Sequence, residues 1–156
     1  MTATFPKERE LVLDRFIDLP RALVWRCWTE PELMKEWYCP APWSIRKPDI
    51  DLRAGGRNNI VMVDPDGNEH PNKGIYLEVI EGEKLVFTDA FTEGWLPSSS
   101  PFMVATVSLR DENGGTRYRA VARHFSEESR KKHEEMGFEA GWNAACDQLI
   151  GLAKTL

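Results

Sequence analysis

The N-terminal part of the chain changes from an alternating pattern of apolar and polar residues to a helical one. The segment ERELVLDRFI, residues 8–17, alternates, which predicts a strand. Asp18 can cap a helix and Pro20 suits a first turn, so a short helix is predicted to end near Trp28. The sequence TEPE at 29–32 has the spacing of a capping box and predicts a second short helix directly afterwards.

From residue 43 to residue 125 the pattern is one of strands separated by turns. Six strand-like runs are joined by short segments rich in glycine and aspartate, which predicts an antiparallel meander. Within it, TEGWLPSSSP at 92–101 is too long and too rich in serine and proline for a hairpin. We therefore expect that segment to be a mobile loop.

The C-terminal segment has the spacing of a long helix. Ser126 can cap it, and helical character continues to about Lys154, with a bend expected at Gly137. Apolar residues recur along it at spacings of three and four, and these lie on one face: Phe138, Trp142, Ala145, Leu149 and Leu152. The order of elements predicts an α+β fold, with the last helix packed on one face of a curved sheet.

Alternation also predicts which face of the sheet is inside. In TRYRAVARHF, residues 116–125, three arginines share one face, so the face with Tyr118 and His124 is predicted to point inward. The preceding strand has a matching apolar face that begins at Met103. Small residues leave space above these strands: Ala105, Ala120 and Ala122. Either the long helix fills that space or a cavity stays open, and the pattern does not choose.

The hairpin around EGE, residues 81–83, is compatible with two registers. A loop of two or four residues places Tyr76 and Glu78 on the face of Phe87. This register buries the Glu78 carboxylate in the protein interior at a cost in free energy. A loop of three residues places Ile75, Leu77 and Val79 on the face of Phe87 instead. Composition alone favours this second register.

Composition narrows the class of protein. A chain of 156 residues is predicted to form one domain, 1–156, with a core that needs neither metal nor disulfide. The net charge is −5 and there is no basic run, which argues against nucleic acid and anionic membrane as partners. Three widely spaced cysteines and a start without a signal-like apolar run favour a cytoplasmic protein with reduced thiols.

The sequence offers few candidates for catalysis. It contains no serine-hydrolase elbow, zinc-protease motif or nucleotide-binding loop. His70 and His133 are predicted to be solvated, whereas alternation points His124 inward. His124 is either a general acid or base, paired with Glu78 or Asp89, or a buried histidine that bonds a backbone carbonyl. We favour the second interpretation.

A family resemblance rests on four stretches: ELVLDRFIDLPRALVWRCWTEPELMKEW, DLRAGGR, GIYLEVIEGEKLVFTDAF and the late GW at 141–142. They resemble the SRPBCC (START-like) superfamily, and within it proteins similar to the C-terminal domain of the activator of the heat-shock-protein-90 ATPase. The resemblance covers nearly the whole chain. It implies a helix-grip fold, in which a curved antiparallel sheet of six to seven strands wraps around a long C-terminal helix and leaves a cavity between them.

The resemblance also has implications for individual residues. It implies that Trp142 and His124 point into the cavity, and it favours the register that turns Tyr76 and Glu78 toward the helix. Relatives often carry a bulky aromatic residue on the strand after AGGR. Here that strand begins with the pair at 58–59, Asn-Asn, which would enlarge or polarise the cavity.

Three functional hypotheses follow. The first is binding of a small apolar or aromatic molecule by these residues: Trp28, Trp37, Tyr76, Glu78, Phe87, Met103, Tyr118, His124, Phe138 and Trp142. The second is an enzyme of cyclase or hydrolase type that uses His124 with a carboxylate. The third is a co-chaperone-like module with a chaperone as partner. No cofactor or metal is expected, and the protein is expected to be a monomer or a homodimer.

Overall fold

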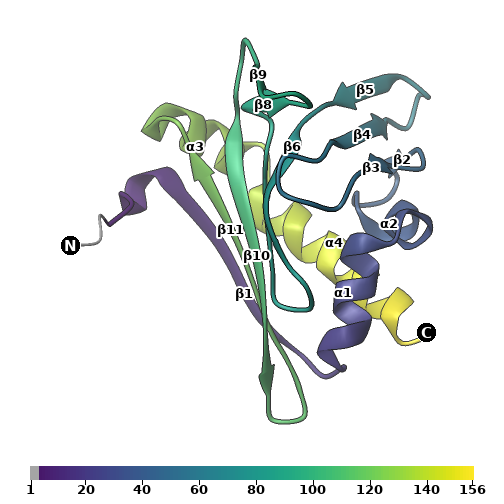
Figure 1. Ribbon diagram of the computed structural model, residues 1–156. Coiled ribbons are helices and arrows are strands. Elements are labelled where there is room, and N and C mark those ends of the chain that lie inside the picture. The colour runs from purple at the N-terminus through teal and green to yellow at the C-terminus, as the bar shows by residue number, and fades with distance from the viewer. Residues whose placement is uncertain (1–3) are drawn as a thin grey trace.

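The computed structural model describes residues 4–156 and shows an antiparallel sheet with one long helix across one of its faces (Figure 1). The strands are β1 (Glu10–Ile17), β2 (Ser44–Ile45), β3 (Asp49–Ile50), β4 (Asn58–Val63), β5 (Glu69–Asn72), β6 (Ile75–Ile80), β7 (Lys84–Thr88), β8 (Phe91–Thr92), β9 (Leu96–Pro97), β10 (Met103–Glu112) and β11 (Gly115–His124). The helices are α1 (Arg21–Thr29), α2 (Pro31–Trp37), α3 (Glu127–Glu135) and α4 (Phe138–Ala153), and a short 3₁₀ turn at Lys7–Arg9 precedes β1. The predicted α+β class and helix-grip architecture are confirmed.

The strands that were expected to form one meander form two sheets and a separate small hairpin. The main sheet has five strands in the order β1-β11-β10-β7-β6, so the first strand lies beside the last. The second sheet has the order β2-β4-β3, with β5 on β4. An isolated bridge between Arg57 and Ile75 links the two sheets. Pro48, which has no N–H to donate to a ladder, separates β2 from β3.

The hairpin of β6 and β7 contains a β-bulge, so neither predicted register applies along its whole length. Tyr76 lies opposite Phe87 and is buried, as in the first register. The register shifts between Tyr76 and Glu78, and Val79 then faces the core, as in the second register. A bulge inserts one extra residue and so exchanges the two faces of a strand. Glu78 therefore points outward, where its carboxylate pairs with the Lys84 ammonium at 3.0 Å.

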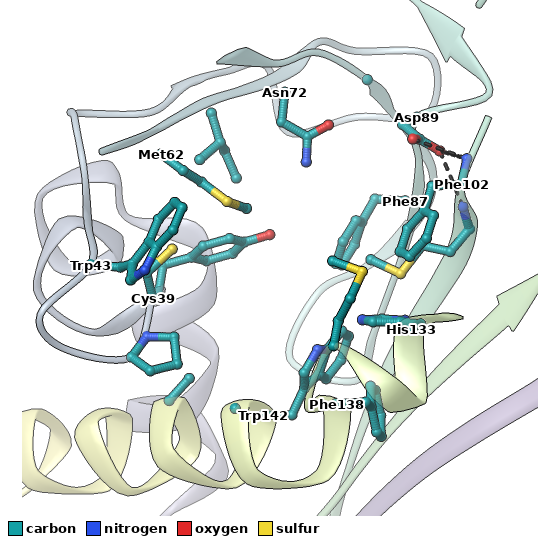
Figure 2. A pocket seen from close by; sticks show the side chains of 18 of the residues that line it. Cys39, Trp43, Met62, Asn72, Phe87, Asp89, Phe102, His133, Phe138 and Trp142 are labelled. Carbon is teal, nitrogen blue, oxygen red and sulfur yellow. Dashed lines mark hydrogen bonds between the residues drawn. The ribbon is translucent and has the colours of Figure 1, made fainter. Parts of the chain in front are cut away.

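The inner face of the main sheet is covered by α4, as the helical periodicity predicted. Tyr118, Ala120, Ala122 and His124 are all buried. Two alanines of the sheet share one buried cluster with residues of the helix: Ala105 and Ala120 with Ala145, Cys146 and Leu149. The helix thus occupies the space above the alanines. An adjoining space beside the helix stays open as a cavity (Figure 2), so both outcomes left open by the sequence occur, in different places.

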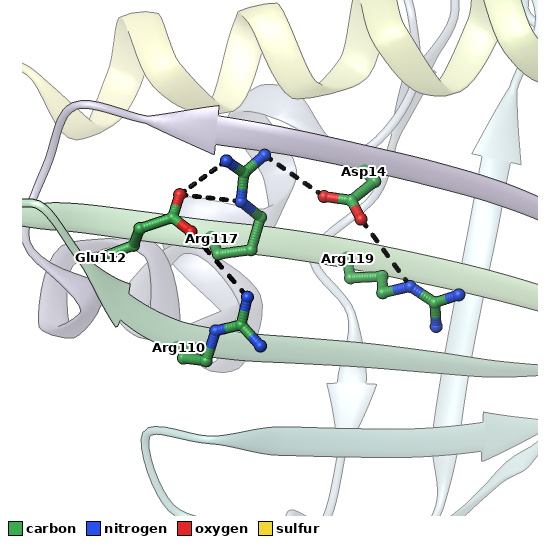
Figure 3. A network of polar contacts seen from close by, with 5 residues as sticks. All are labelled: Asp14, Arg110, Glu112, Arg117 and Arg119. Carbon is green, nitrogen blue, oxygen red and sulfur yellow. Dashed lines mark hydrogen bonds and ion pairs between the residues drawn. The ribbon is translucent and has the colours of Figure 1, made fainter.

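The outer face of the main sheet carries a network of charged side chains (Figure 3). Arg117 lies between two carboxylates, with its guanidinium 2.6 Å from Glu112 and 3.4 Å from Asp14. Arg119 lies 3.8 Å from Asp14, and Arg110 lies 3.9 Å from Glu112. These side chains are partly exposed, so each pair contributes at most about 1 kcal/mol. The prediction that the arginine face points to solvent is confirmed.

Two details of the N-terminal helices differ from the prediction. The N-cap residue of α1 is Pro20 rather than Asp18. The capping box at the start of α2 does not form, because the Thr29 hydroxyl donates a hydrogen bond to the Trp25 carbonyl at 2.8 Å. Threonine can bond back to the preceding turn in this way, and the N-cap position falls to Glu30.

The segment 92–101, expected to be a mobile loop, includes part of a small hairpin. β8 and β9 pair antiparallel, and the turn between them contains Gly94 and Trp95, both at positive φ. The Trp95 ring packs edge-on against Phe91, with 5.8 Å between ring centroids. The serine and proline content, on which the loop prediction rested, gave no indication of this aromatic contact.

The C-terminal helical segment is broken rather than bent. Ser126 caps α3 as predicted, its hydroxyl accepting a hydrogen bond from the Ser129 amide at 3.1 Å. Gly137 has φ 96° and ψ 38°, in the left-handed region, and separates α3 from α4. Gly141, by contrast, lies within α4 and has helical neighbours on both sides. The two glycines therefore have different roles.

Replacing each glycine by alanine is expected to change stability in opposite directions. Gly137→Ala should lower the free energy of unfolding by about 1–2 kcal/mol, because alanine is strained at positive φ. Gly141→Ala should raise it by about 0.5–1 kcal/mol, because a Cβ there meets only Pro40 Cγ, at 3.9 Å. Urea denaturation of both variants checks this, and a change of the same sign in both would contradict it.

Candidate functional site

A cavity of about 740 Å³ lies between α4 on one side and strands β4, β7 and β10 on the other (Figure 2). Its walls come from distant parts of the chain: Trp28, Trp37, Tyr38, Cys39, Pro40, Trp43, Asn58, Ile60, Met62, Asn72, Lys73, Gly74, Phe87, Thr88, Asp89, Phe102, Met103, Tyr118, Lys132, His133, Met136, Gly137, Phe138, Gly141, Trp142 and Ala145. Most of these side chains are apolar or aromatic. Their arrangement depends on α1, α2 and α4 packing around one end of the main sheet.

Aromatic rings form the inner wall of the cavity. Phe138 and Trp142 on α4 lie 4.7 Å apart between ring centroids. Trp28 lies 5.8 Å from Phe87 and donates its indole N–H to the Tyr118 hydroxyl oxygen at 3.2 Å. That N–H is satisfied within the protein, so the wall that Trp28 provides is largely apolar.

The structure brings most of the predicted site residues together. Those that line the cavity are Trp28, Trp37, Phe87, Met103, Tyr118, Phe138 and Trp142. Three predicted residues lie elsewhere. Tyr76 is buried in the core, Glu78 is on the outer face because of the bulge, and His124 lies behind His133. The prediction that these three side chains contact a ligand in the cavity is therefore corrected.

His124 forms a buried pair with His133. His124 Nδ1 lies 2.9 Å from the Arg9 carbonyl oxygen, and its Nε2 lies 2.9 Å from His133 Nδ1. A carbonyl only accepts, so His124 Nδ1 carries the proton, its Nε2 accepts, and His133 Nδ1 donates. As favoured from the sequence, His124 is a buried histidine bonded to a backbone carbonyl.

Burial keeps this histidine pair neutral. Desolvation lowers the pKa of His124 below its ordinary value, and the nearby positive charge of Arg130 lowers it further. Desolvation also lowers the pKa of His133, to about 4, with a smaller contribution from His124. His133 is only 8% exposed, and its ring projects into the cavity (Figure 2).

His133 was not predicted as a site residue. We expected a solvated side chain, because α3 has the sequence EESRKKHEE and contains no apolar residue that would indicate a buried face. His133 is buried by rings from other elements, with centroids 4.8 Å away for Phe102 and 5.2 Å away for Phe138. No local pattern could have revealed these contacts.

The carboxylates proposed as partners of His124 are engaged elsewhere. Asp89 accepts hydrogen bonds from the backbone amides of Phe102 and Met103, at 2.8 and 3.2 Å, and so holds the start of β10. Glu78 is paired with Lys84 outside the sheet. Both ring nitrogens of His124 are also occupied. The acid–base pair that the enzyme hypothesis required is therefore not formed by these residues.

Three further observations concern the residues that the structure describes. Desolvation raises the pKa of Cys39 in the cavity wall to about 11, so its thiol is neutral at pH 7 and a poor nucleophile. Within residues 4–156, no three or more histidine, cysteine or acidic side chains come together as metal ligands would. In the same range no helix combines the length and apolar character needed to cross a membrane.

Comparisons with known proteins agree with this architecture. A family model described as "Activator of Hsp90 ATPase homolog 1-like protein" matches residues 18–154. A solved structure from Nitrosomonas europaea is 44% identical, with a TM-score of 0.93, and the similarity covers 97% of each chain. No curated protein matches the sequence.

More distant structures have the same fold. A protein from Mycobacterium smegmatis is 23% identical with a TM-score of 0.79, covering 99% of this chain and 98% of that chain. An AHSA1-like protein from Aeromonas hydrophila is 18% identical with a TM-score of 0.71, covering 94% of this chain and 92% of that chain. These two show the fold alone. The family model and the relative from Nitrosomonas europaea show more: the chain belongs to the Activator of Hsp90 ATPase homolog 1-like family, within the SRPBCC superfamily.

Proposed function

We propose that the protein binds a small, largely apolar molecule with aromatic character in the cavity beside α4. The observation that supports this most is the cavity itself, about 740 Å³ in volume and lined mainly by aromatic and apolar side chains. Ligand sites in proteins typically measure roughly 300–1,000 Å³ and combine such walls with a few polar groups. The fold of this superfamily is commonly a ligand-binding one.

The energetics favour an apolar occupant. Removing apolar surface from water stabilises a complex by about 25 cal/mol per Å². Trp28, Phe87 and Trp142 present ring surface to the cavity, and aromatic ligands gain further from edge-on or offset contacts with such rings. A bound aromatic molecule would lie against rings whose positions the core already holds.

Binding of a neutral fluorescent probe is the direct experiment. N-phenyl-1-naphthylamine is apolar, uncharged and brightens when it leaves water. We expect its fluorescence to rise on titration with the protein, with a dissociation constant on the order of 10 µM or tighter. The tryptophan emission should fall at the same time, because Trp28, Trp37 and Trp142 line the cavity.

Native mass spectrometry of the protein purified from its own host is the complementary measurement, since a retained molecule would identify the ligand class. A protein that carries no small molecule and leaves the probe fluorescence unchanged would contradict the proposal. Recovery of a chaperone in a pull-down, together with that result, would favour the co-chaperone hypothesis instead.

A further inference from the structure

One fully buried polar atom in the described part of the cavity wall lacks a hydrogen-bond partner within the protein. Asn58, the first residue of β4, is 9% exposed and lines the cavity. Its Oδ1 is buried and has no hydrogen-bond partner among residues 4–156. The backbone fixes the position of this residue, since the Asn58 amide donates to the Gly74 carbonyl at 2.8 Å.

Three other polar groups of the wall have protein partners. The Thr88 hydroxyl donates to the Met103 carbonyl at 2.8 Å and accepts from the Ala90 amide at 3.0 Å. The Tyr118 hydroxyl accepts from Trp28, and His133 Nδ1 is bonded to His124. Asn58 differs from these groups because its oxygen is buried and unpaired.

An unpaired buried amide is costly. Leaving such a group without a hydrogen bond lowers the stability of the fold, and an apolar side chain of similar size would avoid that cost. Solvent does not reach Oδ1 in the free protein. The cost is therefore relieved only when a group in the cavity forms a hydrogen bond with the carboxamide, which can turn over to present its oxygen.

We propose that Asn58 recognises a hydroxyl group, so that the ligand is a mostly apolar ring compound with a hydroxyl at one end. This inference rests on the proposed binding function and specifies the class of ligand. A carboxamide presents a donor on one side and an acceptor on the other, and it can be turned over. A hydroxyl both donates and accepts, so it suits either orientation, while the aromatic wall takes the ring.

A matched pair of probes tests the inference. 2-Naphthol and 2-methylnaphthalene share their rings and differ only by a hydroxyl in place of a methyl group. Both are titrated, with the tryptophan emission as readout, into the wild type, Asn58→Leu and the control Asn59→Leu. Asn59 follows Asn58 on β4, so its side chain points to the opposite face, and it does not line the cavity.

We expect the wild type and Asn59→Leu to bind 2-naphthol about tenfold more tightly than 2-methylnaphthalene, as one hydrogen bond in a dry site allows. Asn58→Leu should lose this preference and still bind 2-methylnaphthalene. If Asn58→Leu does not fold, as judged by circular dichroism, Asn58→Val replaces it, because a β-branched residue suits a strand.

Two results would overturn the inference, and they have different consequences for the proposed function. If the wild type binds both probes equally, or the Asn58 variant keeps the preference, Asn58 does not recognise a hydroxyl, and the cavity remains a binding site. If the wild type binds neither probe, the proposed function and the inference both fail.

Discussion

Acidification from pH 7 to pH 4 is expected to lower the free energy of unfolding by about 3 kcal/mol through His133 alone. The folded-state pKa of His133 is about 4, against an ordinary value of 6.5. Between about pH 6.5 and pH 4, His133 is therefore protonated in the unfolded chain and neutral in the folded protein. Stability falls by up to about 1.4 kcal/mol per pH unit through this window and levels off below pH 4.

Burial and Arg130 also disfavour a charge on His124, whereas the hydrogen bond to the Arg9 carbonyl raises the pKa of His124 and opposes them. The net effect is a lowered pKa of His124. The Arg9 carbonyl accepts the hydrogen bond from His124 Nδ1, so it does not also accept one from a second proton on the histidine pair. Because His133 Nδ1 is hydrogen-bonded to His124, a proton can add to His133 only on Nε2, and the ring that carries it is packed against Phe102 and Phe138.

The measurement is urea denaturation at several pH values for the wild type and His133→Gln. Glutamine is uncharged and can still donate a hydrogen bond to His124, so it serves as a non-titrating substitute. Carboxylates also titrate toward pH 4, and they affect both proteins alike. We expect the wild type to lose about 3 kcal/mol more than the variant between pH 7 and pH 4. Parallel curves would show that His133 is not held neutral by burial.

Gly141→Phe is expected to weaken binding of N-phenyl-1-naphthylamine by about 100-fold, the largest functional effect that we predict. Gly141 lies on the face of α4 that lines the cavity, opposite Pro40, and its missing side chain keeps that space open. A phenyl group there takes up room that the ligand needs. Fold and stability should be retained, because phenylalanine is a better helix former than glycine.

Gly151→Phe is the matched control for this variant. It makes the same substitution in the same helix, but Gly151 is exposed, does not line the cavity, and a Cβ there meets no atom within 4 Å. The control should bind the probe as the wild type does. Equal binding by Gly141→Phe and Gly151→Phe would place the probe outside the cavity and would contradict the proposed function.

The sequence was most informative where a feature depends on one element alone. The face of α4 that carries Phe138 and Trp142 follows from a spacing of four residues, and it does face the sheet and the cavity. The outward arginines of β11 follow from alternation and from the cost of burying charge, as Arg117 and Arg119 show. The family resemblance, drawn from motifs along the whole chain, is confirmed over residues 18–154.

The sequence was misleading where a feature depends on two elements. Glu78 points outward because a bulge forms when β6 pairs with β7, and both registers had remained open until that pairing was known. His133 lies on a helix without apolar residues, so its burial depends on Phe102 and Phe138 from other elements. The asparagines after AGGR were noticed as a departure from relatives, but only the packing shows that Asn58 has an unpaired oxygen.

By itself the sequence determined the kinds of elements, their order, the apolar side of α4 and the inward face of β11. Only the tertiary structure decided where the cavity lies, which histidine lines it and which buried polar atom in its wall has no partner among the described residues. The physical reason is that periodicity records how one helix or strand divides its residues between water and core. The contents of a cavity depend instead on distances between side chains such as Trp28, Asn58 and Trp142, which are far apart in the chain and approach one another only when the elements pack.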